Sequence, residues 1–129
     1  MIAGIGIDVI SPKRFDRIKE KIGKDFFERV FVPGEIEYCE SMKRSMQHYA
    51  ARFAAKEALL KAFGTGLRGE ISWQDVAVRK DELGAPYIEL SGAAEVLAKG
   101  MGVRFIHLSM SHDEDAAAAV VVLEKDLDQ

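Results

Sequence analysis

A long helix in the middle of the chain constrains the fold more than any other feature of the sequence. Residues 45–63 contain no glycine or proline, and Ala, Leu, Lys and Glu, which favour helix, fill most of the stretch. Apolar side chains recur along it at helical spacing, namely Tyr49, Phe53, Leu60 and Phe63. This spacing predicts one apolar stripe that faces the core, and Gly64 predicts the end of the helix.

Two charged side chains of this helix, Glu57 and Lys61, lie at the edge of the predicted stripe. Their four-residue spacing puts them one turn apart on the same face. Taken alone, they fit an ordinary helix ion pair that contributes only about 0.3–0.5 kcal/mol. A functional interpretation needs a second oxygen ligand and a phosphate-sized anion, and the rest of the chain has to supply both.

The N-terminal strand supplies the second carboxylate. Residues 2–10 alternate with period two, which predicts a strand with Ile5, Ile7 and Val9 on one face. The other face carries Gly4, Gly6 and Asp8. Asp8 therefore lies beside positions without side chains, where another group can approach closely. The alternative is that Asp8 only caps the turn that follows the strand.

Length and composition limit the class of protein. The chain of 129 residues is long enough for its own core, so we expect residues 1–129 to form a single domain. A formal net charge of −3 argues against a general nucleic-acid binder. No apolar run approaches the roughly 18 residues of a membrane span, and the N-terminal sequence lacks the order of a signal peptide. With Cys39 as the only cysteine, these features predict a cytoplasmic protein in a reducing compartment.

The first predicted helix, at residues 12–22, carries a basic stripe. Arg14, Arg17 and Lys21 recur at intervals of three and four residues along its outer side. Such a stripe can be a solvated face, or it can steer an acidic protein partner. The sequence alone leaves both interpretations open.

The remaining patterns predict an α+β fold in which a small antiparallel sheet supports the long helix and shorter helices. An apolar cluster at 26–32 is expected in the core. The predicted elements are a helix at 35–42, a hairpin of 71–80 and 85–90, a helix at 91–99, and strands at 103–112 and 116–123. The last two strands are expected to pair across the acidic turn at 113–115.

Three local patterns resemble functional motifs in the wrong context. The glycine-rich stretch 64–69 matches the letters of a dinucleotide fingerprint but follows a helix, although its backbone could still reach a phosphate. The run Ser111 to Asp113 contains the letters of a hydrolase triad, but neighbouring strand residues point to opposite faces. His48 lacks metal-ligand spacing and is assigned to the surface or to packing.

Three motifs together resemble the bacterial holo-acyl carrier protein synthases, which are stand-alone 4'-phosphopantetheinyl transferases. They are Gly4-Ile-Gly-Ile-Asp8, Arg52-Phe-Ala-Ala-Lys-Glu-Ala-Leu-Leu-Lys61 and His107-Leu-Ser-Met-Ser-His112. The second motif, followed by Phe-Gly-Thr-Gly, is the specific one. The resemblance implies transfer of the phosphopantetheine arm of coenzyme A to a serine of an apo acyl carrier protein in fatty acid biosynthesis, with release of adenosine 3',5'-bisphosphate.

The resemblance also implies roles for individual residues. Asp8 and Glu57 would bind Mg²⁺, which commonly uses one or two carboxylates together with substrate phosphates. Lys61 would hold a pyrophosphate oxygen. Glu57 would accept the serine proton, either directly or through a metal-bound water. The coenzyme A contacts implied in addition are Arg52, Gly64, Thr65, Gly66, Pro86 and His107.

Partners and assembly follow from the same resemblance. Arg14, Arg17 and Lys21 would dock the acidic carrier protein. The family implies a homotrimer with active sites between subunits, in which Arg52 and His107 lie across from Asp8 and Glu57. Two alternatives remain open at this point: a carrier-binding or nucleotide-binding module without catalysis, and a structural oligomer of α+β type.

Overall fold

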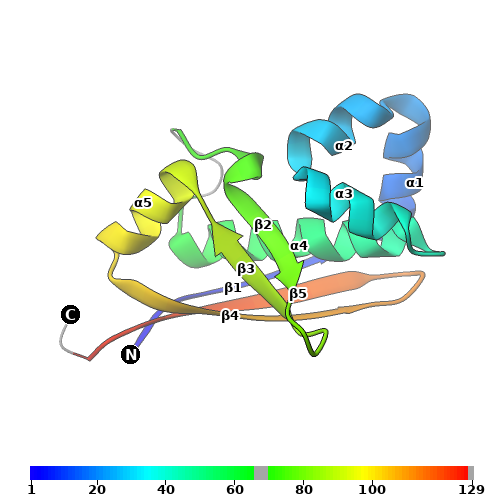
Figure 1. Cartoon of the computed structure of the whole chain (residues 1–129). Helices are drawn as coiled ribbons and strands as arrows, with labels where there is room; N and C mark the ends of the chain where they lie inside the picture. The colour runs from blue at the N-terminus through cyan, green and yellow to red at the C-terminus, as the bar shows by residue number, and fades with distance from the viewer. Residues whose placement is uncertain (66–69, 128–129) are drawn as a thin grey trace.

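A three-stranded antiparallel sheet, with one long helix lying along it, forms the centre of the computed structural model (Figure 1). The structure describes residues 1–65 and 70–127. The strands lie in the spatial order β1, β5, β4, with bounds β1 (Ile2–Ile10), β4 (Val103–His112) and β5 (Ala117–Lys125). The predicted antiparallel pairing of the last two strands is confirmed, since Ala117 lies opposite His112 across the acidic turn. The start of β1 lies beside the end of β5, where Lys125 N donates to the carbonyl oxygen of Met1 at 2.8 Å.

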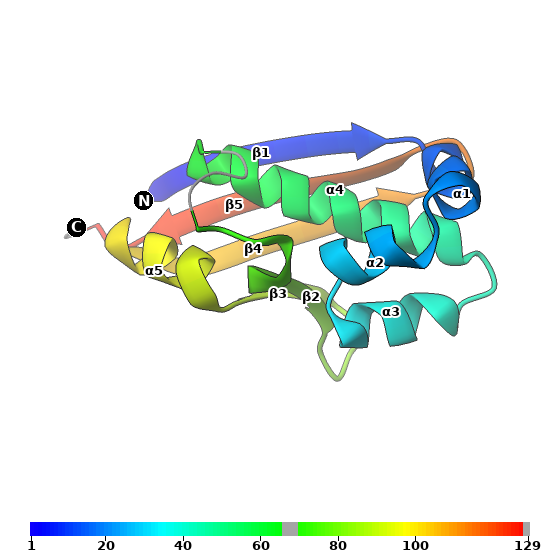
Figure 2. The same cartoon turned by 90° about the horizontal axis from the view of Figure 1, so that it is seen from above.

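The other elements lie on the same side of the sheet as the long helix α4. Seen from above, α1, α2 and α3 gather around the first half of α4, while the β2–β3 hairpin and α5 lie near β4 (Figure 2). None of the helices within the described ranges is long and apolar enough to cross a membrane. The bounds are α1 (Pro12–Lys21), α2 (Lys24–Val30), α3 (Pro33–Glu40), α4 (Ser45–Phe63), η1 (Trp73–Asp75), β2 (Val76–Lys80), β3 (Pro86–Leu90) and α5 (Gly92–Gly100).

Two segments differ from the sequence prediction. The apolar cluster at 26–32 was expected only as core, but most of it belongs to the helix α2. The predicted strand at 71–80 begins only at Val76, because the residues before it form the short 3-10 helix η1. Side chains at both ends hold this helix: Ser72 Oγ accepts from Gln74 N, and Asp75 Oδ2 accepts from Ser72 N. Local side-chain hydrogen bonds of this kind compete with extended structure.

The buried surface of α4 is much wider than the predicted stripe. The helix lies directly on the sheet, and the smaller helices and the hairpin pack around its other sides (Figure 1). Small side chains such as Ala50, Ala54 and Ala58 are fully buried, while Phe53 from the predicted stripe is only partly buried. Even Arg52 and Lys56 lie almost completely out of solvent. Because helical spacing considers one element at a time, it could not predict a helix covered from two sides.

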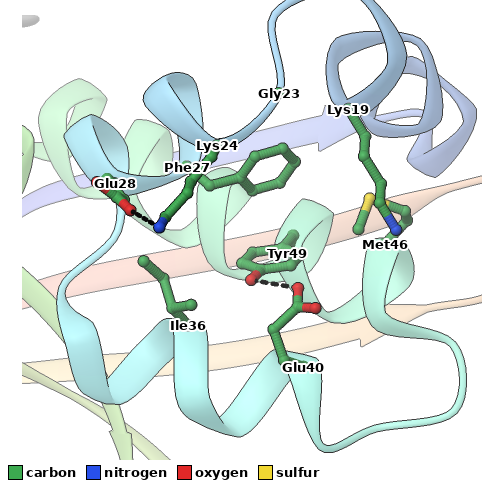
Figure 3. Close-up of a pocket in the computed structure, with 9 residues that line it drawn as sticks. All are labelled: Lys19, Gly23, Lys24, Phe27, Glu28, Ile36, Glu40, Met46 and Tyr49. Atoms are coloured by element: carbon green, nitrogen blue, oxygen red, sulfur yellow. Dashed lines mark hydrogen bonds and ion pairs between the residues drawn. The ribbon is translucent and has the colours of Figure 1, made fainter.

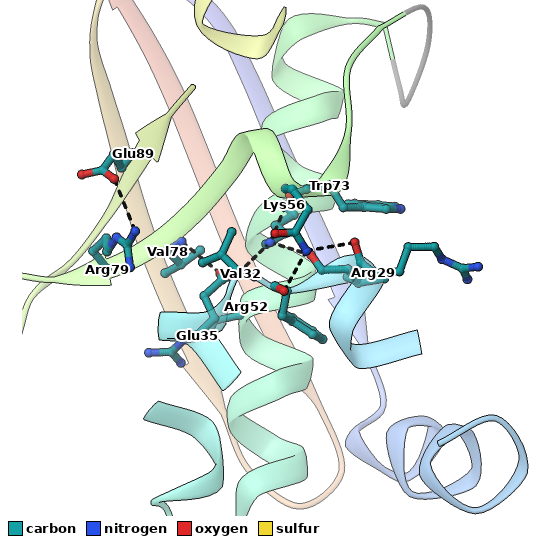
Figure 4. A network of polar contacts seen from close by, with 12 residues as sticks. Arg29, Val32, Glu35, Arg52, Lys56, Trp73, Val78, Arg79 and Glu89 are labelled. Carbon is teal, nitrogen blue, oxygen red and sulfur yellow. Dashed lines mark hydrogen bonds and ion pairs between the residues drawn. The ribbon is translucent and has the colours of Figure 1, made fainter. Parts of the chain in front are cut away.

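Lys56 is buried in a fully paired polar network (Figure 4). Its Nζ lies 2.7 Å from Glu35 Oε1 and donates to the carbonyl oxygens of Val30 and Trp73. The Glu35 carboxylate also accepts the backbone N–H groups of Val32 and Val78. Burial lowers the pKa of Lys56, and the charge of Glu35 opposes that shift. Because both side chains are inaccessible to solvent, the network ties α2, α3, η1 and β2 to α4, and removal of one partner would leave a buried charge unpaired.

Two glycines of β1 allow the strand to lie directly against α4. A Cβ atom at Gly6 would overlap the carbonyl oxygen of Ala58, and one at Gly4 would overlap that of Ala62. The helix backbone therefore occupies the space where side chains of the strand would otherwise stand. The sequence prediction of a close approach on this face agrees with the structure, and the approaching group is the backbone of α4.

The opposite face of the sheet is apolar and uncovered in the single chain. Ile5, Ile7 and Val9 are 65%, 62% and 63% exposed. In the register of the sheet they lie next to Val122, Val120 and Ala118 of β5. No helix lies on this side of the sheet (Figure 1), within the part of the chain that the structure describes. An apolar face of this kind marks an interaction surface.

The contact between β1 and α4 gives a direct test of the fold. We expect Gly6→Ala to lower the free energy of unfolding by about 3 kcal/mol, because the new methyl group meets helix backbone that cannot rotate away. Gly100→Ala is the matched control, since a Cβ there has open space and lies in a helix that favours alanine. Urea denaturation measures both variants. Equal stability of the two variants would contradict the close contact.

Candidate active site

Asp8 and Lys61 meet where β1 lies against α4. Lys61 Nζ lies 3.0 Å from Asp8 Oδ1 and donates to the backbone oxygen of Ile7 at 2.9 Å. The Asp8 side chain is 17% exposed, whereas that of Lys61 is 54% exposed. The glycines that precede Asp8 on the same face bring the strand close enough for this contact. A mostly buried carboxylate and a more accessible ammonium group therefore share one site.

Glu57 lies one helical turn before Lys61 and joins the same site. Burial raises its pKa above the usual glutamate range, and the nearby Asp8 carboxylate raises it further. The charges of Lys61 and Arg14 act in the opposite direction. Two carboxylates and two cations from β1, α1 and α4 thus influence one another, although they are far apart in the sequence.

The donor set of Asp8 and Glu57 fits a magnesium ion. No group of three or more His, Cys, Asp or Glu side chains able to hold a metal occurs among residues 1–65 and 70–127. Mg²⁺ does not need such a cage, because it commonly takes one or two protein carboxylates and completes its shell with water and substrate phosphates. The mutual repulsion that raises the pKa of Glu57 is also what a bound cation would relieve.

Arg52 lies in a different environment on α4. Only 2% exposed, it stacks over the Tyr38 ring at 4.2 Å and approaches the carbonyl oxygen of His48 at 3.5 Å. Its Nε has no hydrogen-bond partner among the described residues. Lys80 Nζ lies 4.9 Å from the centre of the Tyr38 ring. These contacts place Arg52 within a cationic and aromatic cluster between α3, α4 and the hairpin.

Two histidines belong to this cluster: His48, which the sequence assigned to the surface or to packing, and His112, which the sequence named within a motif but gave no binding role. The rings of His48 and His112 lie 4.7 Å apart, and His112 Nδ1 lies 2.9 Å from Gln47 Oε1. Burial, followed by the charges of His112, Arg52 and Lys80, lowers the pKa of His48 to about 4. Burial and the same two cations lower the pKa of His112. The strand alternation, which puts His112 on the same face as Met110, was the one available signal.

His107 lies on the opposite face of the sheet. It is opposite Val122 in the register, its side chain is 57% exposed, and its Nε2 lies 2.8 Å from Glu124 Oε1. Because α4 covers the other face, one chain does not bring His107 and Arg52 together. The predicted arrangement, with Arg52 and His107 together across from Asp8 and Glu57, is therefore not formed within one chain, where Arg52 shares α4 with Glu57.

The other predicted coenzyme A contacts have different positions. Gly64 ends α4 in the left-handed region with φ of 79°, and Thr65 N lies 3.4 Å from the carbonyl oxygen of Leu60. Gly66 lies outside the described residues. Pro86 begins β3 opposite Lys80, which is part of the cluster around Arg52. Pro86 is therefore linked through Lys80 to the surroundings of Arg52.

The basic residues of α1 form an accessible surface. Arg14, Arg17 and Lys21 are all exposed, and with Ile18 and Ile22 they line a shallow hollow of about 330 Å³. Ile22 is 57% exposed. Positive charges around the exposed Ile22 and the partly buried Ile18 suit an acidic partner that also presents an apolar contact.

Comparison with known proteins agrees with the resemblance of the motifs. Residues 4–121 match the model of the 4'-phosphopantetheinyl transferase superfamily. The holo-[acyl-carrier-protein] synthase of Geobacter sp. (strain M21) is 50% identical over 125 residues, covering 97% of this chain and 100% of that protein. The crystal structure of the synthase from Neisseria meningitidis has a TM-score of 0.90 and 39% identity, covering 97% of this chain and 100% of its own.

A third relative was solved with a ligand. The Helicobacter pylori synthase in complex with coenzyme A has a TM-score of 0.82 and 33% identity, and the match covers 93% of this chain and 99% of that one. The α+β architecture is therefore shared along almost the whole length. On the matched family model and these relatives, the chain belongs to the 4'-phosphopantetheinyl transferase superfamily.

Proposed function

We propose that this protein is a holo-[acyl-carrier-protein] synthase, which transfers the 4'-phosphopantetheine group of coenzyme A to a serine of an apo acyl carrier protein. The observation that carries the proposal is the meeting of Asp8, Glu57 and Lys61 at the β1–α4 contact. Membership of the superfamily and the coenzyme A complex of a relative support the same reaction. The second product is adenosine 3',5'-bisphosphate, and the proposed place of the reaction is fatty acid biosynthesis in the cytoplasm.

Asp8 and Glu57 are the proposed ligands of Mg²⁺. When bound, the ion neutralises charge on the pyrophosphate and orients the phosphorus for in-line attack. Lys61 supplies a compact positive charge at the same site and is half exposed. Its partner Asp8 would be engaged by the metal, so the ammonium group is available to hold a pyrophosphate oxygen.

Glu57 is the proposed acceptor of the serine proton. Its raised pKa makes it a stronger base than an ordinary surface glutamate, and the charges of Lys61 and Arg14 favour its ionised form. Arg14 lies on α1, where the carrier protein is proposed to dock. The serine of a carrier protein docked at α1 would thus approach Glu57 from the side of Arg14.

The adenosine end of coenzyme A is proposed to contact residues of two separate regions. Arg52 and its cationic neighbours suit the 3'-phosphate, since its Nε lacks a partner within the described chain. His107, on the open face of the sheet, would contact the nucleotide from another subunit. The Gly64, Thr65 and Gly66 loop and Pro86 are proposed to line the nucleotide groove.

A homotrimer is the proposed assembly. The exposed faces of Ile5, Ile7 and Val9 would be covered by other copies of the chain, which removes apolar surface from water. The same contact would bring His107 of one copy near Asp8 and Glu57 of another. Sedimentation equilibrium at micromolar concentration is expected to give three times the mass of the chain, and a monomer would contradict the assembly.

The activity is tested with an apo carrier protein, coenzyme A and Mg²⁺, by the gain in mass of the carrier protein. We expect Asp8→Asn and Glu57→Gln to reduce the rate by about 10²-fold or more. Glu95→Gln, an exposed helix glutamate, is the control and should transfer normally. If the unmodified protein fails with fatty-acid and polyketide carrier proteins alike, a non-catalytic binding module becomes the better interpretation.

The Glu57 variant also has a stability readout. A glutamate whose folded pKa lies above its unfolded pKa binds more protons when folded, so its ionisation at neutral pH opposes folding. Glu57→Gln removes that ionisation. Its thermal midpoint at neutral pH, measured without metal, should equal or exceed that of the unmodified protein, which separates lost activity from lost fold.

The docking surface is tested by charge reversal. Arg14→Glu is expected to raise KM for the carrier protein about tenfold and to leave KM for coenzyme A nearly unchanged. Because Arg14 also lowers the pKa of Glu57, the assay is run at alkaline pH, which favours ionised Glu57 in both proteins. Lys99→Glu on α5 is the control. Equal changes in both KM values would count against docking at α1.

A further inference from the structure

An apolar cavity lies at the end of the molecule formed by α1, α2, α3 and the start of α4. Its volume is about 330 Å³. Figure 3 shows the rings of Phe27 and Tyr49 and the side chains of Ile36 and Met46 around it. Phe27, Met46 and Tyr49 are 7%, 9% and 1% exposed, so they belong to the core that forms the inner wall. The candidate active site on β1 does not use any of these residues.

The acidic side chains at the rim of this cavity are already paired. Glu28 lies 3.3 Å from Lys24 Nζ, and Glu40 accepts a hydrogen bond from Tyr49 Oη at 2.7 Å (Figure 3). Lys19 is exposed and makes no ion pair within residues 1–65 and 70–127. The side chain of Lys19 extends toward Met46 (Figure 3), so its carbon stem can cover apolar surface while the ammonium group stays in water.

A second cavity of about 440 Å³ adjoins the first and shares Lys19 and Met46 as wall residues. Its charged lining is mainly basic, since Lys13, Lys43 and Arg44 join Lys19. The acidic residues there are Asp16 and Glu114. Lys13 is paired with Asp115 at 3.2 Å, which leaves Lys19, Lys43 and Arg44 without an ion pair in the described part of the chain. An apolar chamber thus opens beside a cationic one.

We propose that the two cavities together form a binding site for a fatty carboxylate. The hydrocarbon chain would lie against Phe27, Ile36 and Tyr49, and the carboxylate would lie at Lys19 between the chambers. The volume of the apolar chamber is within the range of ligand pockets, and removal of a hydrocarbon chain from water drives its occupation. The unpaired cations at the junction select an anionic head group.

A ligand bound in this site would contact α1 on the side opposite its proposed docking surface. Lys19 lines the cavity, and Arg14, Arg17 and Lys21 lie on the outer side of the same helix. A bound fatty carboxylate would therefore change carrier-protein docking, a consequence that rests on the proposed function. Binding itself does not depend on that function and is measured without any carrier protein.

Isothermal titration calorimetry with decanoate tests the site on the full-length protein. We expect saturable binding at one site per chain, with acetate and decanol each binding at least about tenfold more weakly, because each lacks one half of the ligand. Ile36→Phe should fill the chamber and abolish binding, whereas Val96→Phe, at an exposed position on α5, should not. Lys19→Glu should weaken decanoate binding about tenfold, with Lys99→Glu as its control.

Several outcomes would overturn the proposal. No saturable binding of decanoate, or binding unaffected by Ile36→Phe, would reject the apolar chamber as the site. Decanol binding as tightly as decanoate, or unchanged decanoate affinity in Lys19→Glu, would reject the cationic head-group contact. If Ile36→Phe does not fold, the NMR shift of the Met46 methyl group on titration replaces it, because Met46 lines both chambers. An unchanged methyl signal would then count against the proposal.

Discussion

The contact of β1 with α4, made without intervening side chains, is the constraint on which the rest of the molecule depends. Because Gly4 and Gly6 have no Cβ, the backbone of the helix lies against the strand. That closeness lets Asp8, the next residue on the same face, reach Lys61 on the helix. One steric fact thus determines both the packing of the largest helix on the sheet and the meeting of the charged groups that the proposed reaction needs.

The fold could be predicted from the sequence where one element carries its own signal. The helix at 45–63 has strong propensity and a glycine stop, and the strand at 103–112 has clear alternation. The helix α2 was missed because its 7 residues make only about two helical turns, too few for a helical period to stand out in the sequence. The pairing of Glu35 with Lys56 was invisible, since a charged pair inside a protein depends on several distant elements that meet around it.

Some residues of the candidate site could likewise be selected from the sequence, and the surroundings of others could not be predicted. Asp8, Glu57 and Lys61 could be selected because glycines flank the aspartate and a helical turn separates the other two. Arg52 was selected by resemblance, but its near-complete burial against Tyr38 has no signal in the sequence. His112 could not be placed beside Arg52 from the sequence, because only the register of β4 and the cover of α4 bring the two together.

The buried pair of Glu35 and Lys56 restricts how this chain can diverge. Each residue neutralises the charge of the other, and the Glu35 carboxylate also accepts backbone N–H groups. Loss of either residue alone would leave a buried charge unpaired and destabilise the fold, so an evolutionary path that replaces them one at a time passes through a poorly folded intermediate. Replacement of both by apolar residues could leave the fold intact, but it would require two simultaneous mutations. Lys56 immediately precedes Glu57 in the chain. Substitution of Lys56, which has no part in the proposed chemistry, is therefore restricted by the fold, directly beside the residue proposed to accept the serine proton.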